Sequence, residues 1–325
     1  MLRDHLSPQI RSVLVIGNNH ISSSILRALS ELPNIKITLL TSAGQTPFLP
    51  PSVPANRIEH RTTGSIPRYL HDIPNQSRPD LVISTANGGD HDAQIRIIDA
   101  TIAAEIPRFI PAEFGQDTLN PKIQDRLPPS KGKARVLEHL RQKADEGRIE
   151  YVGIATGVLI DQKLSSGDLG FDLKWQSATI HGKGDERFAA STLKWVGDVV
   201  AAAVQRWDAR GVKNEYSYAA ELTTTAHELV ECLEAATGKP WGVGHIETEE
   251  CVREAEKRIQ GGWPDAGMFL MERSVLYDES LGAALPFRDH DATGVLGLEH
   301  GDVKAVVSQV VHDFTHHGKG DCGCG

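Results

Sequence analysis

The segment Ser12-Val13-Leu14-Val15-Ile16-Gly17-Asn18-Asn19-His20-Ile21-Ser22 decides the fold, because a short apolar run leads directly into a turn and then a helix. The run that ends at Ile16 is β-branched and apolar on both faces, which is typical of a buried parallel strand. Apolar residues then recur at helical spacing from Ser22 to Leu32, and Pro33 ends that pattern. The segment therefore predicts a strand, a turn and a helix in succession.

The same alternation continues along the chain. Further strands are predicted at residues 35–40, 81–84, 108–110 and 150–154, and further helices at 92–104 and 131–146. Between residues 41 and 79 we place only a weak strand and a short helix. Parallel neighbours need a crossover, which is usually a helix. The pattern therefore predicts an α/β fold with a doubly wound parallel sheet of the Rossmann type.

The second half of the chain divides into two parts. A strand at 178–181, a helix at 193–207 and a strand at 215–219 are expected to return to the sheet. We thus assign residues 1–160 to a dinucleotide-binding core, with returning elements in about 176–222. Helices are expected at 226–237, 248–260 and 303–314, so residues 223–325 should form a smaller, mostly helical substrate lobe with a flexible tail.

Composition excludes several classes of function. The 325 residues include 34 Lys and Arg against 43 Asp and Glu, a net charge of −9, which argues against nonspecific nucleic-acid binding. No apolar stretch approaches the roughly 20 residues of a membrane span. Four cysteines and a polar N-terminus without a signal-peptide block indicate a reducing, cytoplasmic location. We expect a monomer or homodimer that acts on a small molecule.

The turn after the first strand departs from the glycine-rich fingerprint of dinucleotide-binding proteins. Gly17 is kept, whereas Asn19 and Ser22 stand where two further glycines are usual. Asparagine tolerates a left-handed backbone, and serine can cap a helix and still donate to a phosphate. Phosphate binding at the helix N-terminus therefore stays open, with His20 as a further candidate contact.

The end of the second strand gives little information about the cofactor. Thr41 and Ser42 supply no carboxylate for a ribose 2′-OH, which argues against NAD. They supply no guanidinium for a 2′-phosphate either. Arg57 and Arg61 come later, and we interpret both as solvated charges.

Two later segments form a more specific pattern. The first is Ile83-Ser84-Thr85-Ala86-Asn87-Gly88, and the second is Arg108-Phe109-Ile110-Pro111-Ala112-Glu113-Phe114-Gly115. The second nearly reproduces the pattern R-F-I-P-S-E-F-G, with Ala112 in place of serine. The chain thereby resembles the isoflavone reductase-like (NmrA-like) branch of atypical short-chain dehydrogenases/reductases, which includes phenylcoumaran benzylic ether reductases and pinoresinol–lariciresinol reductases. The resemblance runs from Val13 to about Asp161, and more loosely to Gln205.

This resemblance implies an NADPH-dependent reductase with a single catalytic lysine. The family frame K-x-x-V fits Lys133 to Val136, so the role of general acid/base falls on Lys133, with Lys131 as the alternative. The resemblance implies that NADP is contacted by Gly17, Asn19, His20, Ile21, Ser22, Thr41, Ser42, Thr85, Ala86, Asn87, Gly88, Pro111, Ala112, Glu113, Phe114, Lys133, Thr156, Gly157 and Val158. Phe114 would form an apolar wall of the site.

Other features carry less weight. None of the five tyrosines has a lysine four positions on, so the Tyr-x-x-x-Lys mechanism of ordinary short-chain dehydrogenases is not expected. The tail carries His316, His317, Cys322 and Cys324, but a glycine-rich terminus is usually frayed and we expect no metal site. The following side chains could line a substrate pocket or belong to a core: Trp241, Trp263, Met268, Phe269 and Met271.

Three functions remain open from the sequence. The first is reduction of a small conjugated or aromatic specialised metabolite, such as an enone, a quinone methide or a benzylic ether. The second is a non-redox isomerase, dehydratase or cyclase, if Asn19 and Ser22 exclude the cofactor. The third is an NADP-sensing regulator of the NmrA type, against which the retained Lys133 argues.

Overall fold

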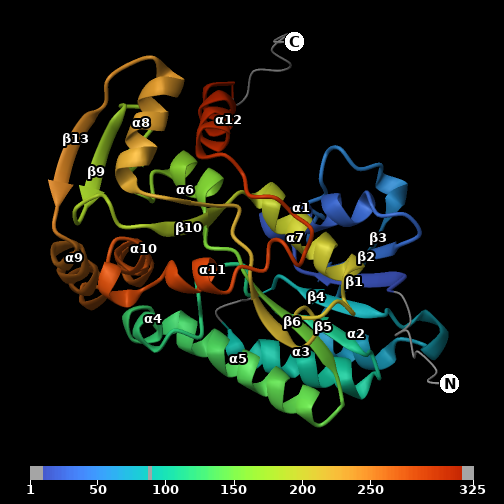
Figure 1. The fold of residues 1–325 in the computed structure, drawn as a ribbon. Coiled ribbons are helices and arrows are strands. Elements are labelled where there is room, and N and C mark those ends of the chain that lie inside the picture. Colours follow the sequence, from blue (N-terminus) through green and yellow to red (C-terminus); the bar gives the residue numbers. More distant parts are fainter. Residues whose placement is uncertain (1–9, 87–89, 317–325) are drawn as a thin grey trace.

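A seven-stranded parallel sheet forms the centre of the computed structural model, which describes residues 10–86 and 90–316 (Figure 1). Its strands are β1 (Ser12–Ile16), β2 (Lys36–Ser42), β3 (Ile58–Thr63), β4 (Leu81–Ser84), β5 (Arg108–Ile110), β6 (Glu150–Ala155) and β11 (Glu215–Tyr218). They lie in the order β11-β6-β5-β4-β1-β2-β3. The order reverses between β1 and β4, and folds of this kind bind ligands at the carboxyl ends of such a pair. The predicted doubly wound Rossmann-type fold is confirmed.

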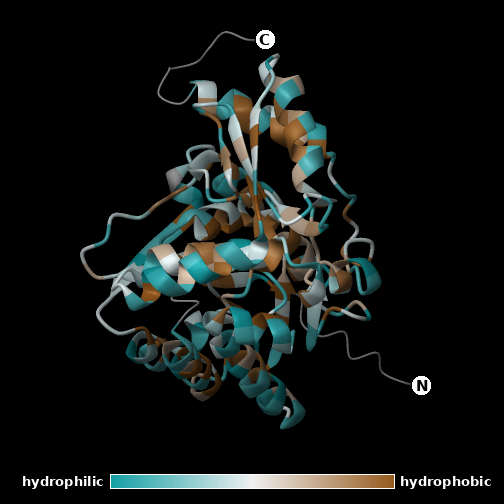
Figure 2. Ribbon diagram, turned by 90° about the vertical axis from the view of Figure 1, so that its left-hand side faces the viewer, coloured by the Kyte–Doolittle hydropathy of each residue, from teal (hydrophilic) through white to brown (hydrophobic). Residues whose placement is uncertain are grey.

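Helices cover both faces of this sheet (Figure 1). One face carries α1 (His20–Ser30) and α7 (Leu193–Gln205), and the other carries α2 (Ile66–Asp72), α3 (His91–Ala103) and α5 (Pro128–Asp145). Successive residues of one strand point to opposite layers, as Val15 and Ile16 show by packing into different apolar clusters. Both clusters are buried, which explains why the strands are apolar on both faces. Figure 2 shows brown, hydrophobic segments gathered toward the middle of the molecule.

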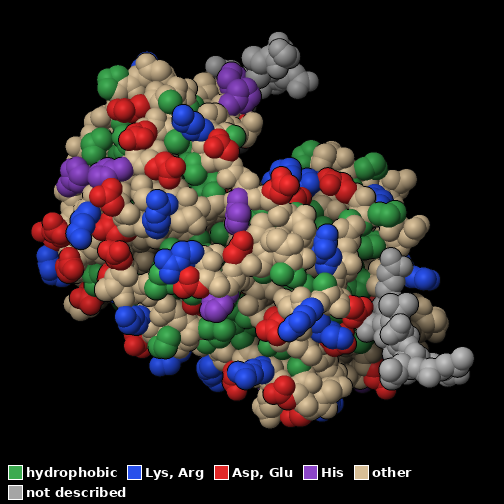
Figure 3. Space-filling view, viewed as in Figure 1, with side chains coloured by type: hydrophobic (Ala, Val, Ile, Leu, Met, Phe, Trp, Pro, Cys, Tyr) green, Lys and Arg blue, Asp and Glu red, His purple; other side chains and the backbone are tan. Residues whose placement is uncertain are grey.

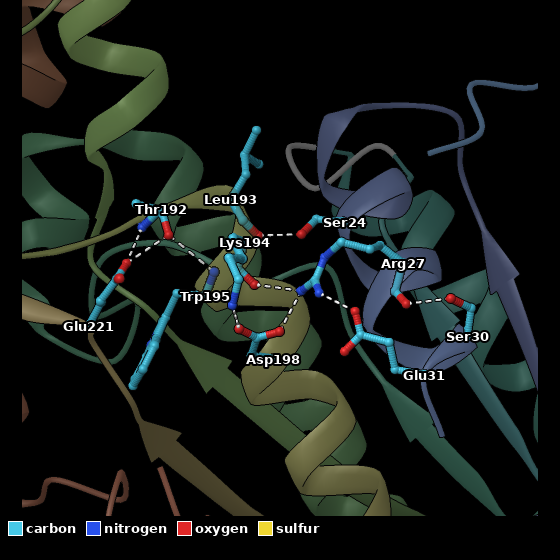
Figure 4. Close-up of polar contacts among 10 residues, drawn as sticks. All are labelled: Ser24, Arg27, Ser30, Glu31, Thr192, Leu193, Lys194, Trp195, Asp198 and Glu221. Carbon is cyan, nitrogen blue, oxygen red and sulfur yellow. Dashed lines mark hydrogen bonds and ion pairs between the residues drawn. The ribbon is translucent and has the colours of Figure 1, made fainter. Parts of the chain in front are cut away.

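Close packing of α7 holds α1 in place (Figure 4). A Cβ at Gly197 of α7 would lie 2.4 Å from the carbonyl oxygen of Ser24 in α1, so the glycine allows the two helix backbones to approach closely. The Ser24 hydroxyl donates to the Leu193 carbonyl, and the Arg27 guanidinium pairs with Asp198 and with Glu31. These contacts therefore hold α1 against α7.

A second lobe contains two small sheets and several helices. One sheet comprises β7 (Val158–Leu159), β10 (Phe188–Ser191) and β12 (Leu222–Thr224), and the other comprises β8 (Phe171–Asp172), β9 (Ser177–His181) and β13 (Gly242–Ile246). Its helices are α6 (Ile160–Ser166), α8 (Ala226–Thr237), α9 (Thr248–Gln260), α10 (Pro264–Leu276), α11 (Leu285–Asp289) and α12 (Val303–His316). The short helix α4 (Pro121–Arg126) precedes α5, and single 3-10 turns occupy Ala55–Arg57, Asn75–Ser77 and Glu279–Leu281.

The lobe differs from the sequence-based expectation in where its strands pair. The strand expected at 178–181 forms as β9, but it pairs with β8 and β13 rather than returning to the central sheet. The reason is packing, since Ala178 and Ile180 join Leu164, Phe171 and Tyr277 in the apolar cluster of the second lobe. Of the elements expected in about 176–222, α7 and β11 do return to the central fold.

Two surface properties are relevant to function. Within residues 10–86 and 90–316, no helix is long and apolar enough to cross a membrane. On the face drawn in Figure 3, acidic and basic side chains alternate rather than gathering by sign.

Candidate active site

The β1–α1 turn requires a glycine at its first position. Gly17 has φ +133°, and a Cβ there would lie 2.1 Å from the Thr85 hydroxyl oxygen at the end of β4. Any side chain would therefore push apart the two strand ends that border the crevice. The sequence-based role of this residue as the tight-turn glycine is consistent with this geometry.

Asn19 and Ser22 replace the other two glycines with a hydrogen-bonded cap. Asn19 has φ −147°, so it does not use the left-handed backbone that asparagine tolerates. Its side-chain oxygen accepts from the Ser22 amide at 2.9 Å, and its side-chain nitrogen donates to the Thr85 carbonyl at 2.9 Å. The buried Ser22 hydroxyl closes this capping box by accepting from the Asn19 amide at 2.9 Å, and it donates to the Asn19 carbonyl at 2.7 Å. Because the first amides of a helix have no intrahelical partner, those of His20 and Ile21 point out of the helix end, where an anion could bind.

The loop after β2 is tied to this turn. The Asn18 side chain donates to the Thr46 carbonyl at 3.0 Å and accepts from the Phe48 amide at 2.7 Å. The ring of His20 packs edge-on against the ring of Phe48, with 4.9 Å between centroids. The exposed His20 thus lies between the helix N-terminus and this loop.

Two hydroxyl side chains stand at the end of β2. Thr41 is buried and its hydroxyl lies 2.9 Å from Nε2 of His60, whereas Ser42 is exposed. The Arg57 guanidinium donates to the backbone carbonyls of Ser30, Leu32 and Ile35. Arg61 pairs with Glu59. Arg57 is therefore engaged in structural contacts rather than simply solvated, whereas Arg61 is an exposed side chain in a surface ion pair, as interpreted from the sequence.

The loop after β5 is joined to the end of β6 by backbone hydrogen bonds. The Phe114 amide donates to the Ile154 carbonyl at 2.9 Å. The Gly115 carbonyl accepts from Thr156 at 3.0 Å and from Gly157 at 2.9 Å. These bonds bring together the E-F-G segment and the segment Thr156 to Val158, two of the predicted cofactor-binding regions.

Unusual backbone geometry marks the same place. Phe114 is a buried non-glycine residue with φ +42°, a conformation that costs of order 1–3 kcal/mol and is concentrated at functional sites. Gly157 has φ +74°, and a Cβ on it would lie 2.3 Å from the Ala189 carbonyl oxygen. The two loops are therefore tightly constrained rather than adaptable.

Lys133 lies on α5 at the edge of this constrained region. Its ammonium donates to the Glu113 carbonyl at 2.8 Å, and it is 3.8 Å from where a Cβ of Gly115 would stand. The residue lines a cavity of about 580 Å³, whereas Lys131 is exposed and is not among the cavity's residues. The geometry thus favours Lys133 over Lys131 as the lysine that reaches a ligand.

The cavity has apolar walls and a few polar groups. It is lined by Ile21, Glu113, Phe114, Gly115, Gln116, Thr118, Leu127, Pro129, Ser130, Lys133, Gly157, Val158, Leu159, Gln162, Lys163, Asp265, Met268, Phe269 and Glu272. Residues from α1, α5, α6 and α10 meet here, so the cavity lies between the Rossmann core and the second lobe. Such a position is typical of substrate sites in α/β enzymes.

A buried carboxyl lies beneath Lys133. The Glu113 side chain accepts a hydrogen bond from the Thr118 hydroxyl at 2.8 Å and from the Tyr216 hydroxyl at 3.4 Å. Burial raises the pKa of the Glu113 carboxyl, although the Lys133 ammonium opposes the rise. Burial also raises the pKa of the Tyr216 phenol well above its usual value. This cluster therefore supports the E-F-G loop from below with hydroxyl and carboxyl hydrogen bonds.

The outer part of the cavity contains residues that the sequence patterns did not indicate. The Lys163 ammonium lies 2.7 Å from Glu272, 3.6 Å from Asp168 and 5.1 Å from the centre of the Phe269 ring. Gln116, Gln162, Lys163, Asp265 and Glu272 were not predicted, since nothing in the sequence links α6 and α10 to the E-F-G loop. Of the side chains proposed for a pocket or a core, Met268 and Phe269 line the cavity. Trp241 and Met271 are buried elsewhere in the lobe, and Trp263 is exposed.

Some predicted residues lie apart or outside the described chain. Ala86, one of the predicted cofactor contacts, accepts at its carbonyl from the side chain of the buried Gln94, which positions the segment after β4. Pro111 and Ala112 form the buried link from β5 to the E-F-G loop, and neither is among the residues that line the cavity. Asn87, Gly88 and the cysteines of the tail lie outside the described residues. Across 10–86 and 90–316, no group of three His, Cys, Asp or Glu side chains is arranged to hold a metal ion.

The amino-acid sequence is similar to those of proteins named oxidoreductases. No known family profile matches the chain. The protein named oxidoreductase aprR of Aspergillus flavus is 27% identical over 303 residues, which cover 93% of this chain and 99% of that protein. Oxidoreductase poxI of Penicillium oxalicum is 25% identical over 284 residues, which cover 86% of this chain and 87% of that protein.

Solved structures share the fold at lower sequence identity. A complex of leucoanthocyanidin reductase with NADPH from Vitis vinifera has a TM-score of 0.69 and 17% identity, and covers 93% of this chain and 99% of its own. A structure from work on pinoresinol–lariciresinol and phenylcoumaran benzylic ether reductases has a TM-score of 0.72 and 15% identity, with the same coverage. The resemblance seen in the sequence is confirmed: the chain has the isoflavone reductase-like fold. It is an enzyme of the oxidoreductase class.

Proposed function

We propose that this protein is an NADPH-dependent reductase of a small conjugated or aromatic specialised metabolite, with Lys133 as the general acid/base. The observation that carries the proposal is the position of the Lys133 ammonium. It lies in a largely apolar cavity, bonded to the Glu113 carbonyl and beside the strained turn at Phe114. The same cavity reaches the first turn of α1 through Ile21.

The residues of the crevice fit a dinucleotide. The amides at the start of α1 would bind the pyrophosphate, and Gly17 keeps the strand ends close enough for that approach. Phe114, Gly157 and Val158 would border the nicotinamide, and the exposed Ser42 and His20 would lie toward the adenosine. When bound, NADPH supplies the hydride. Related structures of this fold include complexes with NADPH and, for AtPrR2, with NADP+ and (+)-pinoresinol.

The chain's own residues would then donate the proton and exclude water from the reacting atoms. Lys133 would give a proton to a substrate oxygen that acquires negative charge as the carbon beside it is reduced. Its bond to the Glu113 carbonyl fixes the direction of the ammonium, and the Glu113 side chain anchors the loop through Thr118 and Tyr216. Phe114, Val158 and Met268 would exclude water from the reacting centre.

A matched pair of lysine variants tests the proposal. We expect the wild type to bind NADPH, seen as a change in its fluorescence, and to oxidise it in the presence of an enone, a quinone methide or a benzylic ether. Lys133→Ala should abolish turnover while changing the NADPH dissociation constant by less than about threefold. Lys131→Ala should retain turnover, because that side chain is exposed outside the cavity.

The alternatives predict different results. Turnover that survives in Lys133→Ala would remove the assignment of the lysine. A wild type that binds no NADPH would favour the non-redox isomerase, dehydratase or cyclase. Tight NADPH binding without turnover of any conjugated compound would favour a sensor of the NmrA type.

A further inference from the structure

One side chain of the cavity lacks the partners that its chemistry requires. Gln116 follows the E-F-G segment and is only 9% exposed. Neither its side-chain nitrogen nor its side-chain oxygen has a hydrogen-bond partner, although both are buried. Buried amides are nearly always paired, so an unpaired donor and acceptor on one carboxamide call for a partner from outside the chain.

The surroundings of Gln116 are already occupied by other bonds. The preceding carbonyl, that of Gly115, accepts from two amides of the β6 segment. The following carboxyl, that of Asp117, accepts from the Tyr218 hydroxyl at 3.1 Å and from the Leu119 amide at 3.0 Å. The residues on both sides of Gln116 are therefore held in place by hydrogen bonds, whereas the side-chain carboxamide of Gln116 has no partner.

Gln116 and Lys133 serve the same cavity. Both residues line it. Gly115, the residue before Gln116, lies close to Lys133, because a Cβ built on Gly115 would be 3.8 Å from the Lys133 ammonium nitrogen. A ligand whose oxygen meets the ammonium would therefore lie beside the segment that carries the Gln116 carboxamide. The remaining wall on this side is apolar, with Phe114 and Val158.

We propose that Gln116 is a substrate-recognition residue, whose carboxamide pairs with a donor and an adjacent acceptor on a planar substrate group, as in a lactam. This inference rests on the proposed function, since it places the lactam-bearing substrate in the cavity of Lys133. One edge of a carboxamide presents an N–H donor beside a carbonyl acceptor in one plane, which is the complement of a cyclic amide edge. A site built this way rejects an analogue that lacks the donor, because its own amide is then left unpaired.

Two probes of nearly equal shape test this pairing. The bicyclic lactam 2-quinolinone carries an N–H beside its carbonyl, and 1-methyl-2-quinolinone has lost that donor. We expect the NADPH-loaded wild type to bind 2-quinolinone at least about tenfold more tightly by calorimetry. Gln116→Met, which keeps the length of the side chain without its hydrogen bonds, should bind the two probes equally. Gln116→Leu provides a second variant in case methionine does not pack.

A matched control and a second readout separate recognition from structure. Gln162 is also a glutamine that lines the cavity, but its side-chain nitrogen and oxygen are not among the buried atoms without a partner. Gln162→Met should therefore keep the preference for 2-quinolinone over 1-methyl-2-quinolinone. Without ligand, Gln116→Met should melt no lower than the wild type, because it removes an unsatisfied buried amide. A lower melting temperature with an unchanged probe ratio would show a purely structural role and overturn the proposal.

Two further outcomes also decide the matter. Weaker NADPH binding in Gln116→Met would show that the amide holds the cofactor, and a wild type with no preference between the probes would show that it meets no lactam. Either result overturns the inference. If the wild type binds no NADPH, the proposed function fails on that titration alone, and the probe comparison on the free protein still tests Gln116.

Discussion

Asn19→Ala should weaken both the fold and the phosphate turn. The side chain makes two hydrogen bonds, one to the Ser22 amide and one to the Thr85 carbonyl. Loss of an N-cap costs about 0.5–2 kcal/mol, and loss of a further hydrogen bond about 0.5–1.5 kcal/mol. We therefore expect the free energy of unfolding to fall by about 1–3 kcal/mol, and NADPH to bind more weakly because α1 and β4 are no longer joined at the crevice.

Asn120 offers a matched control for this variant. It also caps a helix, accepts from the Lys122 amide at 3.0 Å, and donates to a distant carbonyl, that of Leu281, at 2.8 Å. Asn120→Ala should therefore cost a similar free energy in urea unfolding while leaving the NADPH dissociation constant unchanged. Asn19→Gly together with Ser22→Gly restores the usual glycines, and we expect it to loosen the turn as well. Unchanged stability with tighter NADPH binding would refute the reasoning and show that these side chains obstruct the cofactor.

Three other predictions follow from single contacts. Gly157→Ala should lower the melting temperature far more than Gly44→Ala. Both glycines have positive φ, but only Gly157 has a backbone atom within 2.3 Å of its Cβ position. Equal changes of melting temperature in the two variants would argue against this close approach. Burial, with the nearby Arg273, lowers the pKa of His181 from 6.5 to about 4, so only the unfolded chain binds this proton between those values. Stability should thus fall by up to about 3 kcal/mol as the pH drops from 6.5 to 4, and His181→Phe should melt with a weaker acid dependence; parallel curves for the two proteins would count against it. Residues 41–56, which follow β2, contain no Lys or Arg, and Arg57 binds backbone carbonyls, so no cation is placed to bind a 2′-phosphate. NADPH should therefore bind less than about tenfold more tightly than NADH in a fluorescence titration. A ratio of the two dissociation constants above about a hundred would reveal a cation at the 2′-phosphate and contradict this reasoning.

Much of the fold could be predicted because its signals are local. The run Ser12–Ile16 is apolar on both faces because helices cover both faces of β1. Helices α8 and α9 begin and end where their periodicity begins and ends, and Thr225 caps the first of them. The strands of the second lobe were harder to place. β10 and β13 are short, and their partners lie far away in the chain.

The candidate site shows the same division. The E-F-G segment and Lys133 could be found from their order in the sequence, and the structure brings them to 2.8 Å of each other. The sequence left open how Asn19 adapts the turn, because its side chain bonds to whichever carbonyl lies opposite, and that carbonyl belongs to Thr85, which follows β4. Gln116 carried no signal in the sequence, because an unpaired amide is defined only by what surrounds it.

The amino-acid sequence by itself determined the alternation of strands and helices, the class of fold and the lysine of the candidate site, since each depends on spacing along the chain. Only the tertiary structure decided how the altered turn is stabilised, which side chains of α6 and α10 close the cavity, and which buried amide has no partner. Those properties depend on distances between segments that are remote in sequence, and such distances arise only when the core is packed.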